Sequence, residues 1–305
     1  MLYAELVERC AERYKAEHSL DRCCDNCKYK EFCKHDCEEC LKNIHFPDKA
    51  SYSGRTYDCP QMMDYYVCKY TYRYASELIY ALGEIEKLIN LKAQNLRVLS
   101  VGCGPCTDLL ALDFLRNNGI CKFDTLEYVG VEKNPAIYAR IYDDIRELSP
   151  QEYGFNIIPE DICTHVNELK TSKWQPDVIV LQYVFSDMQK HCEMAKIECM
   201  IQDLGEYINS CNTSVSIICN DINLCRSKQG GREYFNDLLN TIDAPRDIYE
   251  LHFSNNDKQQ HFDYGVEYRD NSLIIVPDDS IRQKFNPFLS CSSAQMLIVK
   301  SAEAE

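Results

Sequence analysis

Short apolar runs alternate with amphipathic stretches through most of the chain after residue 95. Each run spans five or six residues and is stopped by glycine or by polar residues, which is typical of a buried parallel strand. The clearest runs are 96–101, 126–131, 155–159, 177–181 and 214–219. Helical spacing appears between the runs, most clearly at 107–117 and 190–209. This alternation predicts an α/β fold whose sheet is mostly parallel and carries helices on both faces.

Two more helices are predicted before the first strand, at 1–18 and 59–91. One face of the first carries residues at helical spacing: Leu2, Leu6, Cys10 and Tyr14. The second has Pro60 at a position suited to a first turn. It also carries a tyrosine stripe at i, i+4 spacing: Tyr66, Tyr70 and Tyr74. Such a stripe indicates either packing against the sheet or a lid over a ligand.

The first strand ends in the glycine turn of VGCGPCTD. Gly102 and Gly104 bracket the turn, and their missing side chains let main-chain amides approach a ligand. The run 107–117 follows at once and presents its N-terminal amides to the same place. The strand, turn and helix together predict a nucleotide cradle.

Polar residues follow each of the next three strands. Glu132 follows the second, where a carboxylate can accept hydrogen bonds from both ribose hydroxyls. Asp161 follows the third strand, and Gln182 with Tyr183 follows the fourth. Ligands of open α/β sheets bind outside the carboxyl ends of the strands, so we expect these side chains to share one crevice.

The series VGCGPCTD, GVEKNPA, PEDI and PDVIVLQYVFSD resembles the successive motifs of the class I S-adenosylmethionine-dependent methyltransferases, over about residues 96–300. The resemblance implies S-adenosylmethionine as methyl donor. It places the glycine turn against the methionine part, the acid after the second strand on the ribose, the acid after the third on the adenine amine, and the residues after the fourth near the methyl group. The residues that match are Gly102, Gly104, Glu132, Asp161, Ile162, Gln182 and Tyr183.

Two positions depart from the family pattern. Ser100 stands where an acid usually precedes the first glycine by two positions, and Cys106 stands at the usual third glycine. Asp108 is the candidate to supply the missing carboxylate. A dinucleotide-binding GxGxxG motif fits less well, because it requires glycine at Thr107 and an acid about 20 residues further on, closer than Glu132.

The resemblance also implies seven strands, the last two forming a hairpin with the final strand antiparallel; residues 295–300 are the candidate for that strand. Further strands are predicted at 247–253, 262–268 and 273–276, and a helix at 233–242. Residues 254–292 are longer than a hairpin needs and are a candidate substrate loop. We expect a methyltransferase domain at 91–305 and a helical, Cys-rich metal-binding module at 1–90.

Nine of the 19 cysteines fall in the first 68 residues. Two CxxC pairs, Cys24 with Cys27 and Cys37 with Cys40, are typical ligands of a tetrahedral zinc ion, and thiolates also hold Fe–S clusters. Reduced structural or redox thiols are the alternative. Further candidate ligands are Cys23, Cys33, His35, Cys59 and Cys68. With few aliphatic residues, 19–58 is expected to form loops organised by metal.

The spacing of Cys33, Cys37 and Cys40 also matches the cluster motif of the radical S-adenosylmethionine enzymes. That assignment is disfavoured. Glu39 stands before Cys40 where those enzymes usually carry an aromatic residue, and no apolar strand precedes the motif.

Composition narrows the location and the partners. The N-terminus mixes acids and bases without an apolar core, and no run approaches the 18 to 20 apolar residues of a membrane span, so we expect a soluble, cytoplasmic protein without a membrane partner. Thiols stay reduced in that compartment. The net charge of −15 argues against bulk attraction to nucleic acid, although a local basic patch remains open.

Methyl transfer needs a nucleophile held about 3 Å from the methyl carbon, and an oxygen or amine nucleophile also loses a proton. The candidate catalytic residues are Tyr183, His191 and Asp221, with Asp187 and Asn220 nearby. Motifs of the amino-methylating and cytosine C5 DNA enzymes are absent after the fourth strand. RNA, protein and small-molecule acceptors remain, with a macromolecule slightly favoured. The alternative is a non-catalytic sensor or assembly subunit that binds the donor and acts through its Cys-rich module.

Overall fold

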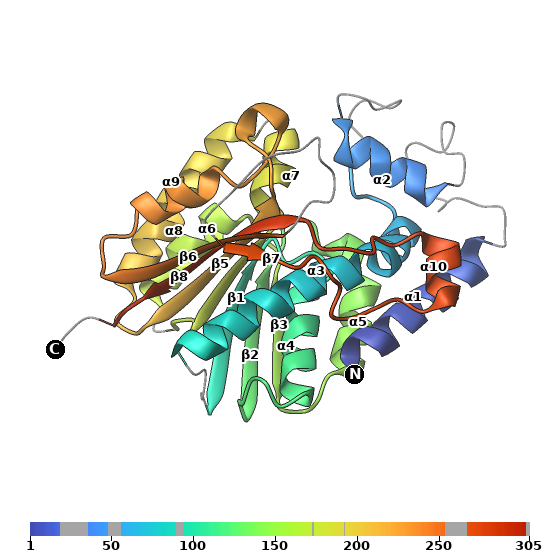
Figure 1. Ribbon diagram of the computed structural model, residues 1–305, viewed down its shortest axis with the longest axis horizontal. Coiled ribbons are helices and arrows are strands. Elements are labelled where there is room, and N and C mark those ends of the chain that lie inside the picture. Colours follow the sequence, from blue (N-terminus) through green and yellow to red (C-terminus); the bar gives the residue numbers. More distant parts are fainter. Residues whose placement is uncertain are drawn as a thin grey trace.

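The computed structural model describes residues 1–18, 36–47, 56–89, 94–172, 174–191, 193–253 and 267–302, which build an α/β structure around one sheet (Figure 1). The eight strands lie in the order β3-β2-β1-β4-β5-β8-β6-β7. Their bounds are β1 Asn95–Val101, β2 Thr125–Val131, β3 Tyr153–Ile158, β4 Val178–Gln182, β5 Val215–Ile222, β6 Arg246–Phe253, β7 Glu267–Arg269 and β8 Ser293–Lys300.

The last strand, β8, lies between β5 and β6 and runs antiparallel to both. All the other pairs are parallel. The predicted insertion of residues 295–300 as an antiparallel final strand is therefore confirmed, and so is a mostly parallel sheet. Seven strands were expected, and the short β7 adds an eighth beside β6.

Alternate residues of β1 point to opposite faces of the sheet, as the period of two requires. Leu96 and Val98 belong to one core, and Leu99 and Val101 belong to the other. Helices α1, α3, α4 and α5 cover the first core, and α6, α8 and α9 cover the second (Figure 1). Because both faces are buried, the strands read as continuous apolar runs.

The helices are α1 Leu2–His18, α2 Cys37–His45, α3 Pro60–Ile89, α4 Thr107–Asn117, α5 Ala139–Leu148, α6 Ile162–Thr171, α7 Val184–Lys190, α8 Met194–Ser210, α9 Tyr234–Asn240 and α10 Asp279–Phe285. Short 3-10 turns occupy Pro135–Tyr138 and Arg226–Lys228. The bounds predicted for α4 match, and the four residues predicted to share the inner face of α1 are all buried.

Two predicted segments differ in the structure. The loop predicted at 37–45 is wrong, because these residues form α2: Asp36 caps the helix by accepting from the main-chain N–H of Glu38 and Glu39, and the apolar face is buried. The strand predicted at 273–276 is also absent, because the hydroxyl of Ser76 on α3 accepts from the main chain there and replaces a strand partner.

The N-terminal helices share a core with the sheet. Asp64 of α3 is fully buried and pairs with Arg13 of α1, 2.9 Å away, and with Arg140 of α5, 2.6 Å away. A buried carboxylate needs such partners, because a buried charge without a partner is strongly destabilising. The expected boundary between modules at residue 90 stays a prediction.

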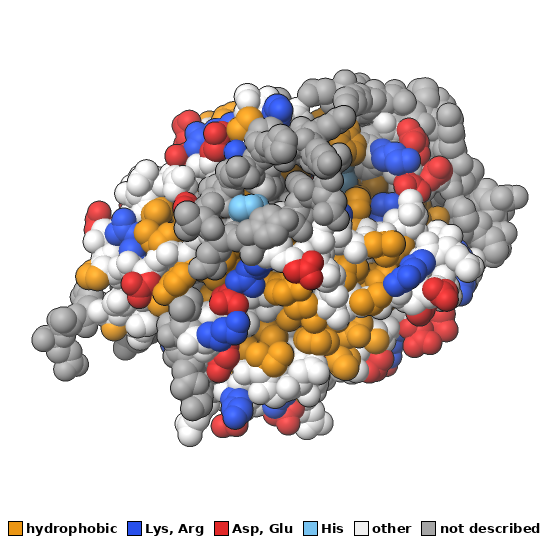
Figure 2. All heavy atoms as spheres, in the orientation of Figure 1, with side chains coloured by type: hydrophobic (Ala, Val, Ile, Leu, Met, Phe, Trp, Pro, Cys, Tyr) orange, Lys and Arg blue, Asp and Glu red, His pale blue; other side chains and the backbone are white. Residues whose placement is uncertain are grey.

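None of the helices in the described ranges is both long and apolar enough to span a membrane. On the face seen in Figure 2, basic and acidic side chains are intermingled among the described residues.

Candidate functional site

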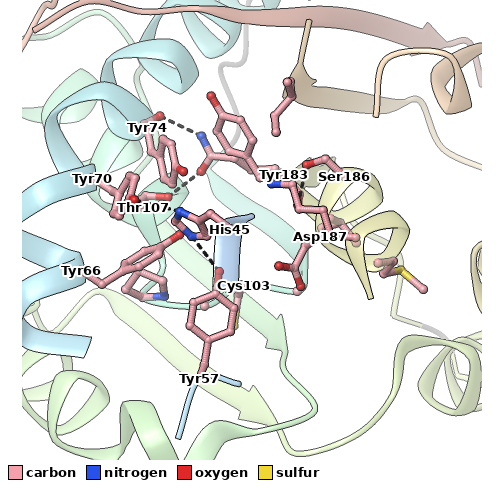
Figure 3. Close-up of a pocket in the computed structure, with 18 of the residues that line it drawn as sticks. His45, Tyr57, Tyr66, Tyr70, Tyr74, Cys103, Thr107, Tyr183, Ser186 and Asp187 are labelled. Carbon is pink, nitrogen blue, oxygen red and sulfur yellow. Dashed lines mark hydrogen bonds between the residues drawn. The ribbon is translucent and has the colours of Figure 1, made fainter. Parts of the chain in front are cut away.

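A cavity of about 980 Å³ lies at the carboxyl ends of β1, β2 and β4 (Figure 3). Its far side is closed by residues of α2, of α3 and of the segment 286–292. This volume is at the upper end of the range for ligand pockets. Eight of the predicted site residues line it: Gly102, Gly104, Asp108, Glu132, Asp161, Ile162, Gln182 and Tyr183.

The glycine turn forms one wall of the cavity. Gly102 has φ of 60° and Gly104 has φ of 46°, values that residues with a Cβ rarely adopt. A Cβ added to Gly102 would lie 3.1 Å from Val184 Cγ2, so glycine also allows the close approach of α7. Cys106, at the position of the usual third glycine, adopts the same left-handed region with φ of 58°.

Glu132 directly follows β2, and its side chain turns back toward this glycine turn. Its Oε2 accepts from the main-chain N–H of Gly104 at 3.3 Å, and its Oε1 accepts from that of Asn134 at 2.9 Å. Burial raises the pKa of Glu132, while the two main-chain donors oppose that rise. The carboxylate is thus held in a fixed orientation beside the turn.

Asp108 reaches the cavity from the first turn of α4. Tyr128 donates to its Oδ1 at 2.8 Å, and the Ser100 hydroxyl also lies against the carboxylate. Burial raises the pKa of Asp108. The family pattern has its acid at the position of Ser100 in β1. Here the Asp108 carboxylate lies beside Ser100, but it comes from α4.

The ends of β3 and β4 complete this half of the cavity. Asp161 caps α6 by accepting from the main-chain N–H of Cys163 at 3.1 Å, and Ile162 begins that helix. The amide of Gln182 bridges two elements: its Oε1 accepts from Thr107 at 2.6 Å, and its Nε2 donates to the carbonyl of Tyr74 at 2.9 Å.

Tyrosine rings form the opposite wall, which we call the tyrosine wall: Tyr57, Tyr66, Tyr70, Tyr74 and Tyr183 (Figure 3). Ring centroids are 4.5 Å apart for Tyr66 and Tyr70, and 5.2 Å apart for Tyr70 and Tyr74. Tyr74 and Tyr183 are 4.3 Å apart, so the wall crosses from α3 to the end of β4. The predicted stripe on α3 therefore faces the cavity.

His45, at the end of α2, was missed by the sequence analysis. Its Nδ1 lies 2.9 Å from the Tyr70 hydroxyl and its Nε2 lies 3.0 Å from that of Tyr57 (Figure 3). Burial lowers the pKa of His45 to about 3, so the ring is neutral at pH 7. A neutral imidazole donates from one nitrogen and accepts at the other. The N-cap and helical spacing of α2 were the signal that could have placed this residue.

Of the three predicted catalytic residues, one lines the cavity and two do not. Tyr183 lines the cavity, and its hydroxyl donates to Glu77 at 2.7 Å. Among the described residues, Asp221 and His191 lie outside the cavity lining. β5 extends to residue 222, so Asp221 is buried within the strand and accepts from the main-chain N–H of Ser186 and of Ile222.

Asp187, on the first turn of α7, does line the cavity. Its Oδ1 lies 3.9 Å from Nε2 of His191. Burial raises the pKa of Asp187, with the neighbouring His191 and Lys190 opposing that rise. The Asp187 carboxylate thus faces the cavity, and His191 lies next to it outside the cavity lining.

The predicted metal ligands are only partly within the described residues. Cys37 and Cys40 lie one turn apart on α2 and are buried, whereas Cys24 and Cys27 lie outside the described residues. Within the described ranges, the side-chain groups arranged to hold a metal ion are on α6 and α8 or beside them. The N-terminal metal site stays a prediction.

No protein-family model matches the sequence, and no curated protein sequence matches it. Similar solved structures include a SAM-dependent methyltransferase from Archaeoglobus fulgidus, 16% identical over 73% of this chain and 94% of that chain, with a TM-score of 0.39. The O-methyltransferase TomG from Streptomyces achromogenes, in complex with SAM, is 10% identical over 87% and 90%, with a TM-score of 0.39. Human methyltransferase-like protein 13, in complex with SAH, is 11% identical over 76% and 81%, with a TM-score of 0.32.

Proposed function

We propose that the protein transfers a methyl group from S-adenosylmethionine to an acceptor held against the tyrosine wall. One observation carries the proposal. Residues from four separate motifs, each predicted to bind the donor, line a single cavity, and that cavity continues to a wall of aromatic rings. A donor half and an acceptor half in one cavity are what a transferase requires.

The donor half fits S-adenosylmethionine by the chemistry of its groups. Carboxylates at Glu132 and Asp161 suit ribose hydroxyls and an adenine amine, and the amides of the glycine turn suit a carboxylate. Asp108 suits an ammonium group. S-adenosylmethionine supplies a methyl carbon already activated by the positive sulfonium. We therefore propose for these residues the donor-binding roles that the family resemblance implies.

The acceptor half must place a nucleophile about 3 Å from that carbon and remove its proton. We propose Asp187 as the proton acceptor, because it faces the cavity and burial raises its pKa above that of an ordinary aspartate, which makes its carboxylate a stronger base. The acceptor oxygen or nitrogen forms the new bond to carbon, the carbon–sulfur bond breaks with its electron pair left on sulfur, and the proton passes to Asp187. His191 would orient Asp187, and direct catalytic roles for His191, Tyr183 and Asp221 stay predictions.

The tyrosine wall favours an acceptor with a flat group, since aromatic rings bind flat groups by stacking or edge contacts. Both a nucleobase and a small aromatic compound meet this condition. We keep RNA or another macromolecule as the slightly favoured acceptor. The cytoplasmic location and the zinc or Fe–S site of the Cys-rich segment likewise remain parts of the proposal.

Calorimetry with S-adenosylmethionine and with its demethylated product tests donor binding directly. Turnover is tested by adding tritiated donor and cell extract, and then treating the labelled products with nuclease or with protease. Label removed by nuclease identifies an RNA acceptor, and label removed by protease identifies a protein. Label that resists both and passes a small-pore filter identifies a small molecule.

The same measurements separate the enzyme from the sensor. A donor-binding sensor would give tight binding in the calorimeter and no labelled product in any extract. Ser100 and Cys106, the departures from the family pattern, are the features that favour this second function. Absence of donor binding would contradict both functions.

A further inference from the structure

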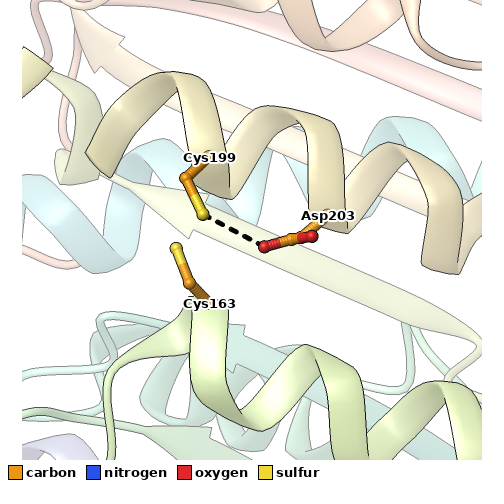
Figure 4. A group of neighbouring side chains, drawn as sticks. All are labelled: Cys163, Cys199 and Asp203. Atoms are coloured by element: carbon orange, nitrogen blue, oxygen red, sulfur yellow. Dashed lines mark hydrogen bonds between the residues drawn. The ribbon is translucent and has the colours of Figure 1, made fainter. Parts of the chain in front are cut away.

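Two cysteines and an aspartate meet between α6 and α8, in a place that the proposed function does not use (Figure 4). Cys163 lies in the first turn of α6, while Cys199 and Asp203 lie one turn apart on α8. One ligand atom from each residue lies within 4.8 Å of the other two. The Cys199 thiol donates to Asp203 Oδ2 at 3.2 Å.

The three groups have the chemistry of a zinc site. Zinc binds thiolate sulfur at about 2.3 Å and carboxylate oxygen at about 2.0 to 2.2 Å, usually with four ligands in a tetrahedron. Tetrahedral geometry with those bond lengths puts two sulfurs about 3.8 Å apart. Since the ligand atoms lie within 4.8 Å of one another, the two sulfurs need to approach by no more than about 1 Å. Cys199 is exposed and Cys163 is half-buried, so little packing opposes such shifts.

Lys170 forms an ion pair with the Asp203 carboxylate. Its Nζ lies 3.6 Å from Asp203 Oδ1 and 2.7 Å from Glu206 Oε2. One oxygen of Asp203 therefore has a cationic neighbour, and the other faces the thiols. Partners of this kind orient metal ligands. With Lys170 and Glu206 counted, two thiolates and Asp203 leave one net negative charge around a divalent zinc ion.

A pair of nucleophilic or redox-active cysteines is the alternative to a metal site, and the two thiols are poorly suited to that role. Burial and the adjacent Cys199 raise the pKa of Cys163, and the hydrogen bond to Asp203 raises the pKa of Cys199. The thiolate is the species that attacks a disulfide or an oxidant, so both groups are slow nucleophiles when no metal is bound. A metal ion displaces the two protons, and its affinity therefore rises with pH.

We propose that Cys163, Cys199 and Asp203 bind a zinc ion, with water as the fourth ligand, and that this ion clamps α6 to α8. The clamp lies next to the cavity. The main-chain N–H of Cys163 donates to Asp161, which lines the cavity, so a metal at Cys163 also fixes the turn that positions Asp161. The zinc site itself does not depend on the proposed function.

The test compares full-length variants, because the predicted N-terminal site would also bind metal and only a difference is informative. Proteins purified with reductant are dialysed against a weak chelator, and zinc is counted by mass spectrometry. Cys199→Ser should hold one zinc per chain fewer than wild type. Cys225→Ser changes another partly exposed cysteine, which is not a member of the cluster, and should match wild type. Circular dichroism confirms that each variant is folded.

Two further measurements address the ligands. Cobalt substitution should give a thiolate-to-cobalt absorption that is weaker in Cys199→Ser than in wild type. Asp203→Asn should keep the zinc count at saturation but bind at least tenfold more weakly in competition with a chromogenic chelator. Equal zinc content and equal cobalt spectra in wild type and Cys199→Ser would overturn the proposal. A disulfide between Cys163 and Cys199 in protein that was purified with reductant and supplemented with metal would also overturn the proposal.

Discussion

The main-chain N–H of Gly104 donates to Oε2 of Glu132 at 3.3 Å, which joins the glycine turn after β1 to the acid that follows β2. Asn134 holds the other oxygen through its main-chain N–H at 2.9 Å. Glu132 is therefore oriented before any ligand arrives, and binding does not have to fix a rotating side chain. This preorganisation favours affinity for a ligand that presents two hydroxyls.

Glu132→Ala should weaken donor binding at least tenfold, about 1.4 kcal/mol, because a charge-assisted contact is lost. Calorimetry with S-adenosylmethionine measures the change, and Glu152→Ala, an exposed carboxylate before β3, is the matched control. Burial raises the pKa of Glu132, so its carboxylate is protonated at a higher pH than an ordinary glutamate. As the pH is lowered, wild-type affinity for the donor should therefore begin to fall at a higher pH than with an ordinary glutamate. Unchanged affinity in Glu132→Ala would remove Glu132 from the donor site.

Tyr74→Leu should lower transfer to the acceptor about tenfold while leaving donor affinity nearly unchanged. Tyr74 stacks on Tyr70 and lies 4.3 Å from Tyr183, so its ring joins two parts of the tyrosine wall. Aromatic pairs contribute about 0.5 to 1.5 kcal/mol beyond their burial. Tyr74→Phe keeps the ring and should retain most activity in the tritium assay. Loss of donor binding in Tyr74→Leu would contradict the division of the cavity into two halves.

His45 should remain neutral from pH 5 to pH 8, since burial lowers its pKa to about 3. The folded state then binds fewer protons than the unfolded state between pH 3 and pH 6.5, so this residue makes stability increase as the pH rises through that range. NMR of the imidazole protons in wild type, with His45→Gln to assign the signal, measures the titration. A midpoint near pH 6.5 would show that His45 is exposed to water rather than held between Tyr57 and Tyr70.

Asp221 should make the stability of the folded state decrease as the pH rises, opposite to the effect of His45. Burial raises its pKa to about 6, so between pH 4 and pH 6 the folded state binds more protons than the unfolded state. Stability of wild type relative to Asp221→Asn should therefore fall by roughly 2 to 3 kcal/mol from pH 4 to pH 7. Urea unfolding of both proteins at several pH values gives the difference. A relative stability that rises over this interval would contradict the raised pKa.

Cys24→Ser should release metal from the predicted N-terminal site and disturb the acceptor half of the cavity. Helix α2, which carries Cys37 and Cys40, also contributes Glu38, Lys42 and His45 to the cavity lining. Transfer should collapse, while donor affinity, which depends on residues after 95, should change little. Metal analysis, calorimetry and the tritium assay are run together, with Cys225→Ser as control. Full activity in a protein that lacks this metal would exclude the coupling.

The sequence by itself determined most of the sheet and the cavity residues that lie at the carboxyl ends of its strands. Strands and helices alternate in a pattern that local hydrophobicity reveals, and the residues that follow parallel strands must meet at one edge of the sheet. Gly102, Glu132, Asp161 and Gln182 could therefore be assigned to one crevice from their positions alone, and the structure places all four in one cavity.

Only the tertiary structure decided the opposite side of the cavity. Lys69 of α3 donates to the carbonyl of Asn286, 217 positions away, and this contact brings the segment 286–292 to the cavity. The place of His45 depends on how α2 packs on α3, and the burial of Asp221 depends on β5 extending beside β8. Contacts between such distant segments arise from packing, which no local pattern encodes.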